Sequence, residues 1–344
     1  MKVALIGLGM VADTHLAALK AANGIDLCGV LARRRTTTEQ FAAKASKTLG
    51  TTVKAYNDIQ HLVGDTEVDF AIIATPPDAR ADLVENLVAA RIPILMEKPV
   101  ERTFAAAQDI VSRCSMASVP LGVIFQHRAR EVSQLLRRLL QDGAIGDITT
   151  AELRVPWWRD QSYYENPGRG SYARDGGGVM ITQAIHTLDL ALWFLGPIAE
   201  IQALMHRTQV HAMEAEDWAG AVFTTRKGVA GHIIATTAAY PGSADSITLN
   251  GTKGTAHLEV GTLSISTTDG DAQTYGDVGG SGGGADPMAF THEWHQAVIE
   301  DFAQAVRDKR APIASGQAAL LAHAVIDAME RSSASGHRVE VLTS

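Results

Sequence analysis

The sequence predicts a two-domain α/β protein, with a doubly wound parallel sheet first and an α+β domain with an open, largely antiparallel sheet second. Apolar runs without alternation recur before residue 126, as expected for strands buried on both faces of a parallel sheet. Beyond about residue 145, alternating runs are joined by short turns, as in antiparallel sheets. A chain of 344 residues suits two domains of about 100 to 200 residues each. We place these domains at 1–125 and 126–344.

The first domain alternates strands with helices. Its apolar, β-branched runs predict strands at 3–7, 27–31, 70–74, 92–96 and 121–125. Apolar residues at helical spacing predict helices at 11–22, 38–49, 78–90, 104–115 and 132–142. This alternation is typical of parallel sheets, because each helix crosses over from one strand to the next.

The second domain begins with alternating strands. Strands are expected at 149–155, 219–225, 229–235 and 246–250, with a turn at 251–254. Helices are expected at 181–195, 292–308 and 316–332. The last two are expected to pack either within the second domain or back on the first. The glycine-rich stretch 276–286 has the composition of a flexible loop.

Composition excludes several classes of function. A net charge of −8 argues against binding to duplex nucleic acid, which requires a basic surface. Two cysteines, Cys28 and Cys114, offer neither a disulfide framework nor a cysteine metal site. Apolar runs stay shorter than the roughly 20 residues of a membrane span, and the chain starts as a strand rather than a signal peptide. We therefore expect a cytoplasmic protein with small-molecule partners.

A dinucleotide-binding turn is predicted at the end of the first strand. Gly7 and Gly9 begin a G-x-G-x-x-A pattern that ends at Ala12, between a strand and a helix. Gly7 permits the tight turn, Gly9 lets a pyrophosphate approach, and the amides near Met10 and Val11 face it from the helix N-terminus. This is the pattern of a Rossmann domain. The alternative is a tight turn without a ligand.

The end of the second strand bears on the choice of cofactor. Dinucleotide sites that prefer NAD usually have Asp or Glu here, but this sequence has Ala32 followed by Arg33 and Arg34. A guanidinium group can donate two parallel hydrogen bonds to the oxygens of a phosphate. We expect NADP to be preferred, with NAD possible; the alternative is that these arginines form a solvated helix entry.

Two further segments follow strands of the parallel sheet. Thr75 and Pro76 follow one strand, and Glu97 and Lys98 follow another, at the carboxyl ends where such sheets bind ligands. The ammonium of Lys98 is suited to polarising a substrate hydroxyl. A surface ion pair is the alternative for Lys98.

A glycine run precedes a helix in the second domain. Three glycines at 176–178 would let the backbone pass close to a ligand. Thr182 and His186 are one helical turn apart, with Asp189 near the same face. An imidazole can take a proton from an alcohol near neutral pH. The alternative for His186 is a structural role in the core.

Aromatic and arginine side chains gather just before the glycine run. The segment 157–164 holds two tryptophans, an arginine and two tyrosines, and Arg169 follows. Aromatic faces with polar groups suit a sugar, whereas the alternative is a packed lid. His292 and His295 lie at i and i+3 on one predicted helix, with no carboxylate-plus-histidine set nearby in the sequence, so we predict no metal site.

Together these motifs resemble the Gfo/Idh/MocA family, named for glucose-fructose oxidoreductase and inositol dehydrogenase. The similarity rests on the G-x-G-x-x-A turn, Thr75-Pro76, Glu97-Lys98-Pro99, the glycine run, and the helix with His186 and Asp189. It covers nearly the whole chain, including the turn at 251–254 and the ending at 312–339. The resemblance implies a Rossmann domain, then a domain whose open sheet packs between the subunits of a homodimer or homotetramer.

The resemblance also implies roles for residues. Lys98 would hydrogen-bond the reacting hydroxyl, and His186 would act as acid or base. Many members have Asp where this chain has Thr182, so a carboxylate is missing from the proton path. Arg80 stands where the family often has His, and we assign it no role. The substrate-side candidates are Lys98, Arg159, Tyr164, Arg169, Thr182, Gln183 and His186.

We therefore expect reversible hydride transfer between a nicotinamide and a secondary alcohol or anomeric hydroxyl of a sugar or cyclitol, without a metal. The alternatives are a nucleotide-sugar dehydrogenase, a redox-neutral enzyme with tightly bound NAD and, more weakly, a non-catalytic NADP(H)-binding protein.

Overall fold

The computed structural model describes residues 1–277 and 291–342, which divide into two compact units. The first unit contains residues 1–101, 105–126 and 291–319. The second contains residues 102–104, 127–277 and 320–342 of the described chain.

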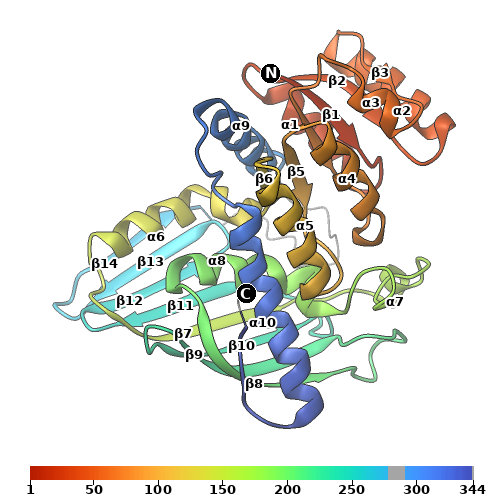
Figure 1. Cartoon of the computed structure of the whole chain (residues 1–344). Helices are drawn as coiled ribbons and strands as arrows, with labels where there is room; N and C mark the ends of the chain where they lie inside the picture. Colours follow the sequence, from red (N-terminus) through yellow and green to blue (C-terminus); the bar gives the residue numbers. More distant parts are fainter. Residues whose placement is uncertain (278–290, 343–344) are drawn as a thin grey trace. The chain divides into compact units, whose positions relative to one another are not determined.

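The first unit is built on a six-stranded parallel sheet with the order β3-β2-β1-β4-β5-β6 (Figure 1). Its strands are β1 (Lys2–Ile6), β2 (Asp26–Leu31), β3 (Lys54–Ala55), β4 (Phe70–Ile73), β5 (Ile94–Glu97) and β6 (Leu121–Ile124). Each strand pairs in parallel with its neighbour, and β4, β5 and β6 are buried along their whole length. The order reverses beside β1, so the predicted doubly wound sheet is confirmed.

Helices complete the first unit. They are α1 (Ala12–Ala21), α2 (Arg35–Leu49), α3 (Ile59–Val63), the 3₁₀ turn η1 (Pro77–Ala79), α4 (Ala81–Ala89), α5 (Phe104–Met116) and α9 (Glu293–Asp308). Although α9 is far from α1 in the sequence, the two helices pack together. The chain then makes a bridge from Ser315 to Gly122 of β6, so this late segment belongs to the first unit.

The second unit is built on a nine-stranded sheet with the order β14-β13-β12-β11-β7-β10-β9-β8-β15. Its strands are β7 (Ile148–Pro156), β8 (Ile198–His206), β9 (Trp218–Thr225), β10 (Ala230–Thr236), β11 (Ser246–Gly251), β12 (Gly254–Glu259), β13 (Thr262–Thr267), β14 (Ala272–Gly276) and β15 (Val339–Glu340). Among the described strands of this sheet, only β7 and β10 pair in parallel, so the prediction of a largely antiparallel sheet is confirmed.

Helices and short helical turns complete the second unit. They are η2 (Gln126–Ala129), α6 (Glu131–Gln141), α7 (Gln161–Tyr164), the π-helical turn η3 (Met180–Ala184), α8 (Ile185–Leu195) and α10 (Gly316–Ser335). The helix α6 packs against β12, β13 and β14, and α8 packs against β7 and β11. Near the end of α10, the hydroxyls of Ser332 and Ser333 accept the amides of Ala203 and Met205 on β8. Most of α10 thus belongs to the second unit.

Several local features differ from the sequence predictions. The helix expected at 181–195 begins with a π-helical turn, which holds more residues per turn than an α-helix, so Thr182 and His186 are not simply one α-helical turn apart. The helix predicted at 38–49 begins earlier, at Arg35. The glycine-rich stretch predicted as a loop lies outside the described residues beyond Asp277.

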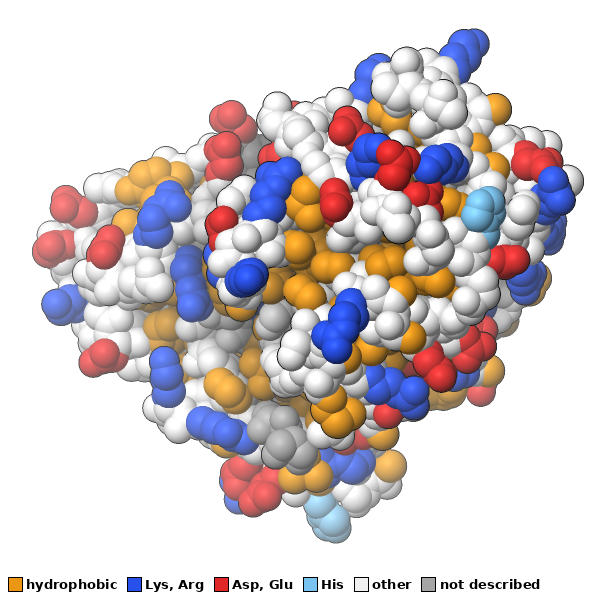
Figure 2. Space-filling model, turned by 45° about the horizontal axis from the view of Figure 1, so that its top comes forward, with side chains coloured by type: hydrophobic (Ala, Val, Ile, Leu, Met, Phe, Trp, Pro, Cys, Tyr) orange, Lys and Arg blue, Asp and Glu red, His pale blue; other side chains and the backbone are white. Residues whose placement is uncertain are grey.

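The surface of the protein is charged and mixed in sign. Figure 2 shows Lys and Arg side chains interspersed with Asp and Glu side chains over one face. No helix among the described residues is both long and apolar enough to cross a membrane. The predicted cytoplasmic location stays a prediction.

Candidate active site

The turn after β1 has the geometry that the glycine pattern predicts. Gly7 has φ +97°, and a Cβ at this position would lie 2.6 Å from the backbone carbon of Ala74, so only glycine fits. Gly9 is exposed, and a Cβ there would meet no protein atom within 4 Å. Met10 is 52% exposed. The protein therefore leaves open space next to the backbone at Gly9, where a pyrophosphate would approach.

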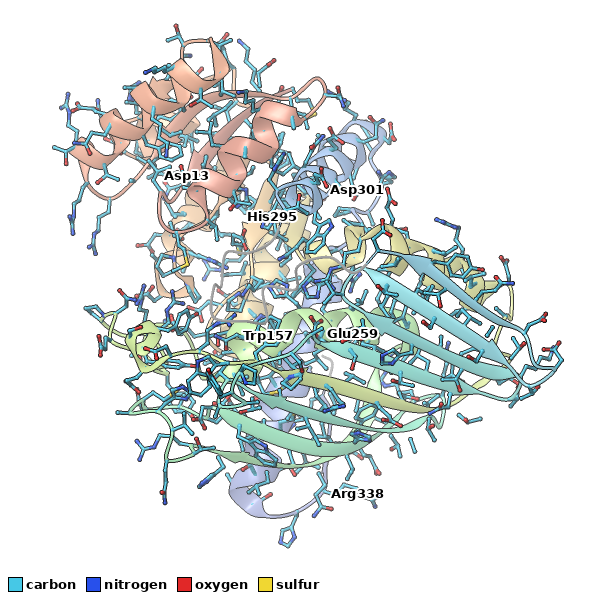
Figure 3. The ribbon with its side chains drawn as sticks, turned by 180° about the vertical axis from the view of Figure 1, so that it is seen from behind. Asp13, Trp157, Glu259, His295, Asp301 and Arg338 are labelled. Carbon is cyan, nitrogen blue, oxygen red and sulfur yellow. The ribbon has the colours of Figure 1, made fainter. Side chains whose placement is uncertain are left out.

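The N-terminus of α1 is not capped by a side chain. Val11 is the N-cap residue, and no side chain bonds to the first amides there. The amide of Ala12 donates to the carbonyl of Gly9 at 3.1 Å. Asp13 lies in the first turn, but it is exposed and its carboxylate pairs with Lys44 at 2.6 Å (Figure 3). Uncapped amides at a helix N-terminus suit a phosphate group, so the residues present fit a dinucleotide.

The segment after β2 presents arginines to solvent. Thr38 is buried and its hydroxyl accepts the amide of Ala32 at 3.0 Å, which fixes the start of this segment. Arg33 and Arg34 are exposed. Arg35, in contrast, pairs with Glu39 at 2.8 Å along the helix. Two guanidinium groups are thus placed directly after the strand.

The segment after β4 carries a buried hydroxyl without a partner. The Oγ1 atom of Thr75 is buried and makes no hydrogen bond to any described residue, while Pro76 is exposed. A buried polar atom without a partner costs free energy unless a ligand or water satisfies it. Thr75 therefore fits a role in binding a ligand at the carboxyl end of this strand.

Arg80 is a buried residue whose importance the sequence did not reveal. Its guanidinium donates to the carbonyl of Thr75 at 2.7 Å and also to the carbonyls of Glu97 and Pro99. Burial lowers the pKa of Arg80 to about 10, which leaves it charged at neutral pH. By bonding to the carbonyls on both sides of Lys98, Arg80 holds the backbone of that residue in place.

Glu97 is buried beside two histidines, one from α1 and one from α9. Its Oε1 atom lies 2.9 Å from Nε2 of His15 and 3.6 Å from Nε2 of His295. The two imidazole rings meet edge to face at 5.4 Å. We call these three residues the His15–Glu97–His295 cluster. Figure 3 marks His295 on α9.

Electrostatics within this cluster favour an ionised carboxylate. Burial alone raises the pKa of Glu97, but hydrogen bonds from His15 and His295 hold it well below its usual value. Burial lowers the pKa of His295, although Glu97 opposes this shift. The sequence showed no carboxylate-plus-histidine set near His295 because the members of this cluster come from distant segments, and the fold brings their ligand atoms within 4.8 Å of one another. That this site binds no metal stays a prediction. The same contacts turn the Glu97 carboxylate toward the interior.

Lys98 follows Glu97 and is half-buried. It lies close enough to His295 to affect its pKa. Its position at the end of β5 is therefore fixed by the buried carboxylate before it and by the Arg80 contacts to Glu97 and Pro99.

His186 lies on α8 in the second unit and is 6% exposed. Its ring stacks on the ring of His127, with the centroids 4.9 Å apart and the planes 28° from parallel. The Nδ1 atom of His127 lies 3.8 Å from Oδ2 of Asp245. Sequence reasoning identified His186 but neither His127 nor Asp245, because their proximity arises only from the fold.

Asp189 has a structural partner. Both of its oxygens accept hydrogen bonds from Arg128 at 2.7 Å, and both side chains are buried. Burial raises the pKa of Asp189, and Arg128 opposes that shift. This bidentate pair ties α8 to the η2 segment instead of leaving the carboxylate for substrate.

The glycine run packs against protein rather than leaving room for a ligand. The amides of Gly178 and Met180 donate to the carboxylate of Glu216 at 3.0 and 3.1 Å. A Cβ on Gly178 would overlap the carbonyl of Glu216, and one on Gly176 would lie 2.6 Å from the backbone of Arg102. Our interpretation that these glycines make space for a ligand is therefore corrected: they make space for neighbouring backbone.

The π-helical turn positions two predicted substrate residues. The hydroxyl of Thr182 donates to the carbonyl of Gly178 at 2.6 Å and also contacts Oε1 of Gln183. The amide of Gln183 reaches the hydroxyl of Tyr163 at 3.4 Å. A π-helical turn is rare and often marks a functional site.

Tyr163 contacts three of the predicted substrate-side residues, whereas the hydroxyl of the predicted Tyr164 bonds to Thr237. The ring of Tyr163 lies under the guanidinium groups of Arg169 at 4.8 Å and of Arg159 at 5.8 Å. Tyr164 is 8% exposed and its hydroxyl bonds to Thr237 at 2.7 Å. The sequence could not separate two adjacent tyrosines, because only their side-chain directions differ.

Arg159 is buried among aromatic rings. Its guanidinium lies 5.2 Å from the ring of Trp157 and donates to the carbonyl of Trp158 at 2.7 Å. It is 3% exposed. Tyr163, Arg159, Arg169 and Gln183 are joined in a chain of contacts, which we call the Tyr163 cluster.

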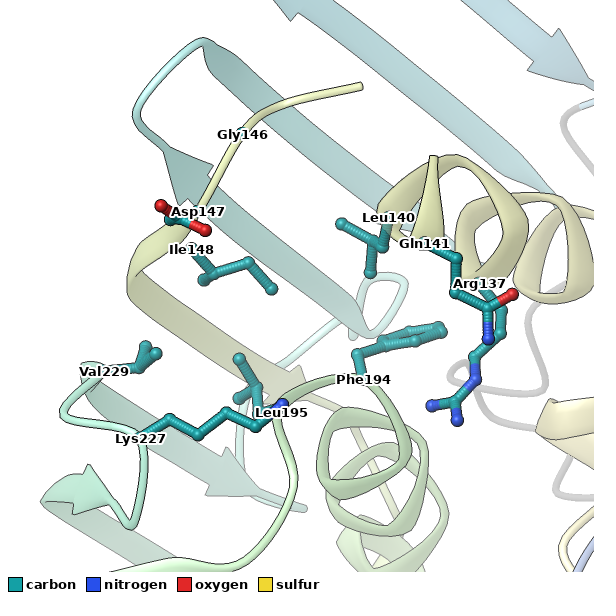
Figure 4. Close-up of a pocket in the computed structure, with 10 residues that line it drawn as sticks. All are labelled: Arg137, Leu140, Gln141, Gly146, Asp147, Ile148, Phe194, Leu195, Lys227 and Val229. Atoms are coloured by element: carbon teal, nitrogen blue, oxygen red, sulfur yellow. The ribbon is translucent and has the colours of Figure 1, made fainter. Parts of the chain in front are cut away.

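A separate groove in the second unit contains none of the predicted site residues. It has a volume of about 620 Å³ and lies between the end of α6, the end of α8 and the turn that precedes β10 (Figure 4). Arg137, Asp147 and Lys227 supply its charged groups. We do not include this groove in the candidate active site.

Comparison with known proteins identifies the family. Residues 1–125 match the model described as an oxidoreductase family with an NAD-binding Rossmann fold, and residues 133–257 match the GFO/IDH/MocA C-terminal domain. The chain belongs to the GFO/IDH/MocA oxidoreductase family. This confirms the resemblance inferred from the sequence, together with the predicted fold and enzyme class.

Two relatives in this family match nearly the whole chain. The D-apiose dehydrogenase of Rhizobium rhizogenes is 25% identical over 99% of this chain and 97% of its own. The inositol 2-dehydrogenase of Rhizobium meliloti is 25% identical over 99% of each chain. A crystal structure of the WlbA dehydrogenase from Chromobacterium violaceum with NADH and UDP-GlcNAcA is 25% identical, covers 99% of this chain and 96% of its own, and has a TM-score of 0.81.

Proposed function

We propose that this GFO/IDH/MocA protein is an NAD(P)-dependent dehydrogenase that acts on a secondary alcohol or anomeric hydroxyl of a sugar or cyclitol. The observation that carries the proposal is the pairing, in one chain, of an open glycine turn with a π-helical turn that joins polar and aromatic side chains near His186. The names of the apiose and inositol dehydrogenases support this substrate class.

The first unit would hold the cofactor through its backbone and through polar side chains that follow β2, β4 and β5. Gly7 and Gly9, with the amides near Met10 and Val11, would receive the pyrophosphate. We propose that Arg33 and Arg34 bind a 2′-phosphate, so that NADP is preferred over NAD, although the WlbA structure contains NADH.

The segments after β4 and β5 would complete the cofactor contacts. Thr75, Pro76 and Lys98 lie at the carboxyl ends of these strands, where this sheet type binds its ligand. We propose no direct contact between the cofactor and Glu97, because the carboxylate of Glu97 is hydrogen-bonded to His15. When bound, the nicotinamide accepts or donates the hydride.

Lys98 and His186 would both act on the substrate hydroxyl. Lys98 would donate a hydrogen bond to the substrate oxygen and stabilise its developing negative charge. An imidazole nitrogen of His186 would accept the hydroxyl proton as hydride leaves the carbon, and return it in the reverse direction. Thr182 lacks a carboxylate, so it would bind the substrate and not carry the proton.

The Tyr163 cluster would orient the sugar. Tyr163 offers an aromatic face and a hydroxyl, while Gln183 and Arg169 offer donors on the same side. Fixing the sugar hydroxyls in this way aligns one carbon for reaction. A nucleotide-linked sugar is the second candidate substrate, and the WlbA complex with UDP-GlcNAcA favours it.

We also propose that the open sheet forms a homodimer or homotetramer. Leu204 on β8 and Ile234 on β10 both pair with Gly220 on β9, and Val222 follows on the same face. These three apolar side chains are 58%, 44% and 59% exposed. A row of this kind is costly in water unless it is covered. Light scattering coupled to gel filtration would give the subunit number, and a Val222→Lys variant is expected to be smaller.

Absorbance at 340 nm tests the proposed activity. The enzyme is mixed with NAD or NADP and with pentoses, hexoses, sugar lactones, inositols, uronic acids and one UDP-sugar. We expect reduction of the cofactor by one substrate class, and at least about a hundredfold loss in Lys98→Ala and His186→Ala. The exposed Lys20→Ala and His337→Ala variants are matched controls and should keep full activity. Full activity of His186→Ala would overturn its role.

A further inference from the structure

His186 is in direct contact with a second imidazole. The rings of His186 and His127 stack at 4.9 Å, so a charge on one ring is felt by the other. Both residues are less than 7% exposed, and water screens the interaction weakly at such burial. The protonation states of these two histidines are therefore coupled.

A buried carboxylate stands on the far side of His127. Asp245 is 3% exposed, and its Oδ2 atom lies 3.8 Å from Nδ1 of His127. The same oxygen accepts a hydrogen bond from the hydroxyl of Thr187 at 2.8 Å, which holds the carboxylate in position. Its Oδ1 atom has no hydrogen-bond partner among the described residues. The imidazolium form of His127 would balance this charge together with Arg130, which also experiences the charge of Asp245.

Other charged groups near the two rings are already paired or lie on the side of Asp245. Arg128, which is adjacent to His127, makes the bidentate pair with Asp189 of α8. Arg130 is buried and experiences the charge of Asp245. The carboxylate of Asp245 thus acts on His127 from one side, and His186 stacks on its other side.

We propose that Asp245 and His127 are positioning residues that set the proton affinity of His186. Asp245 favours the protonated form of His127. The resulting imidazolium repels a second proton from the stacked ring of His186. His186 therefore stays neutral at the pH at which it must accept a proton from the substrate hydroxyl. This inference rests on the proposed function of His186 as a base.

The pH profile of kcat/KM tests this inference with the substrate found in the screen. His127→Phe keeps an aromatic ring but cannot carry a charge, and it leaves Asp245 less compensated than in the wild type, with Arg130 still nearby. The acidic limb of the profile should then move up by about one pH unit. Adding Asp245→Asn removes the remaining charge, so the double variant should return toward the wild-type limb. His257→Phe, at a half-buried position on β12 where the ring contacts Thr248, is the matched control.

Each outcome decides the question. A limb that stays in place in His127→Phe, whether or not kcat falls, overturns the inference and leaves only a structural role. A shift that the double variant does not reverse excludes Asp245 as the source of the charge that causes it. Activity retained in His186→Ala contradicts the proposed function itself, and that result is separate from these.

A measurement on the unmodified protein does not depend on turnover or on the folding of variants. Nuclear magnetic resonance titration of the histidine nitrogens, with labelled imidazoles, reports each protonation directly. We expect His127 to take up its proton at higher pH than His186. The opposite order would overturn the inference.

Discussion

The imidazole of His15 lies 2.9 Å from the carboxylate of Glu97 in the interior of the first unit. His15 is one turn into α1, the helix that starts at the glycine turn, and Glu97 directly precedes Lys98. One buried hydrogen bond therefore links the predicted pyrophosphate turn to the predicted catalytic lysine. His295 contacts the same carboxylate from α9.

Replacing this carboxylate should destabilise the protein. Glu97→Ala leaves two buried imidazoles without their acceptor, and we expect a loss of about 3 to 5 kcal/mol in the free energy of unfolding. Urea denaturation measures this loss. Glu39→Ala, which removes an exposed pair with Arg35, should cost less than about 1 kcal/mol. Equal losses in the two variants would contradict a special role for Glu97.

The contribution of Glu97 to stability should depend on pH. Its pKa is held below the usual value in the folded protein, so its contribution is complete above the unfolded pKa of about 4.3 and is lost as pH falls through the lower folded value. The difference in unfolding free energy between the wild type and Glu97→Gln should be constant near neutral pH and shrink in acid. A difference that grows as pH falls would show the opposite sign.

The His15–Glu97–His295 cluster should not require a metal ion. Two imidazoles and a carboxylate are possible zinc ligands, but Arg80 and Lys98 lie close by and would repel a divalent cation. We expect dialysis against a chelator to leave the melting temperature and the activity unchanged. One equivalent of zinc per chain, lost in His295→Ala, would contradict this prediction.

The two glycines of the first turn should respond differently to substitution. Gly7→Ala forces a strained φ and a clash with Ala74, so it should lower the free energy of unfolding by about 2 kcal/mol or more. Gly9→Ala meets no protein atom and should leave stability unchanged, but it should weaken dinucleotide binding at least about tenfold. Calorimetric titration with NADP measures the second effect. Unchanged binding in a folded Gly9→Ala variant would refute the predicted pyrophosphate contact.

Cofactor preference should depend on the two exposed arginines after β2. The double variant Arg33→Ala and Arg34→Ala should reduce kcat/KM with NADP about tenfold to a hundredfold more than with NAD. Arg35→Ala is the control, because Arg35 pairs with Glu39 on α2. A wild-type enzyme that prefers NAD, or a ratio unaffected by the double variant, would contradict the assignment.

Substitutions at two adjacent tyrosines should have different effects, one on substrate binding and the other on stability. Tyr163→Phe removes the hydroxyl that meets Gln183, so KM for the sugar should rise about fivefold to tenfold with little change in unfolding. Tyr164→Phe breaks the buried bond to Thr237 and should cost about 1 kcal/mol in stability while KM stays unchanged. The reverse pattern would restore Tyr164 as the substrate residue.

Local patterns in the sequence were sufficient for most of the parallel sheet and for part of the second sheet, in which β8, β12, β13 and β14 were not predicted. The apolar runs of the parallel sheet, the glycine turn and the turn at 251–254 each arise from neighbouring residues, and the structure has them within a few positions of the predicted bounds. The His15–Glu97–His295 cluster joins segments up to 280 positions apart, and no local pattern reports such a contact.

The directions of side chains were the second feature that the sequence could not predict. The sequence identified the aromatic loop but not which tyrosine faces Gln183, and it identified His186 but not the ring stacked on it. It also could not show that the glycine run is filled by Glu216, because glycine permits close approach of protein and ligand alike.

The carboxylate of Glu216 distinguishes the helix start of the second unit from that of the first. In α1 the helix start has no side-chain cap, whereas at η3 the amides of Gly178 and Met180 are occupied by a carboxylate of the protein itself. Burial raises the pKa of Glu216, and the hydrogen bonds from these amides oppose that shift. The amides at η3 are already satisfied within the protein, so an anionic group would have to displace a side chain there, whereas at the start of α1 it would not.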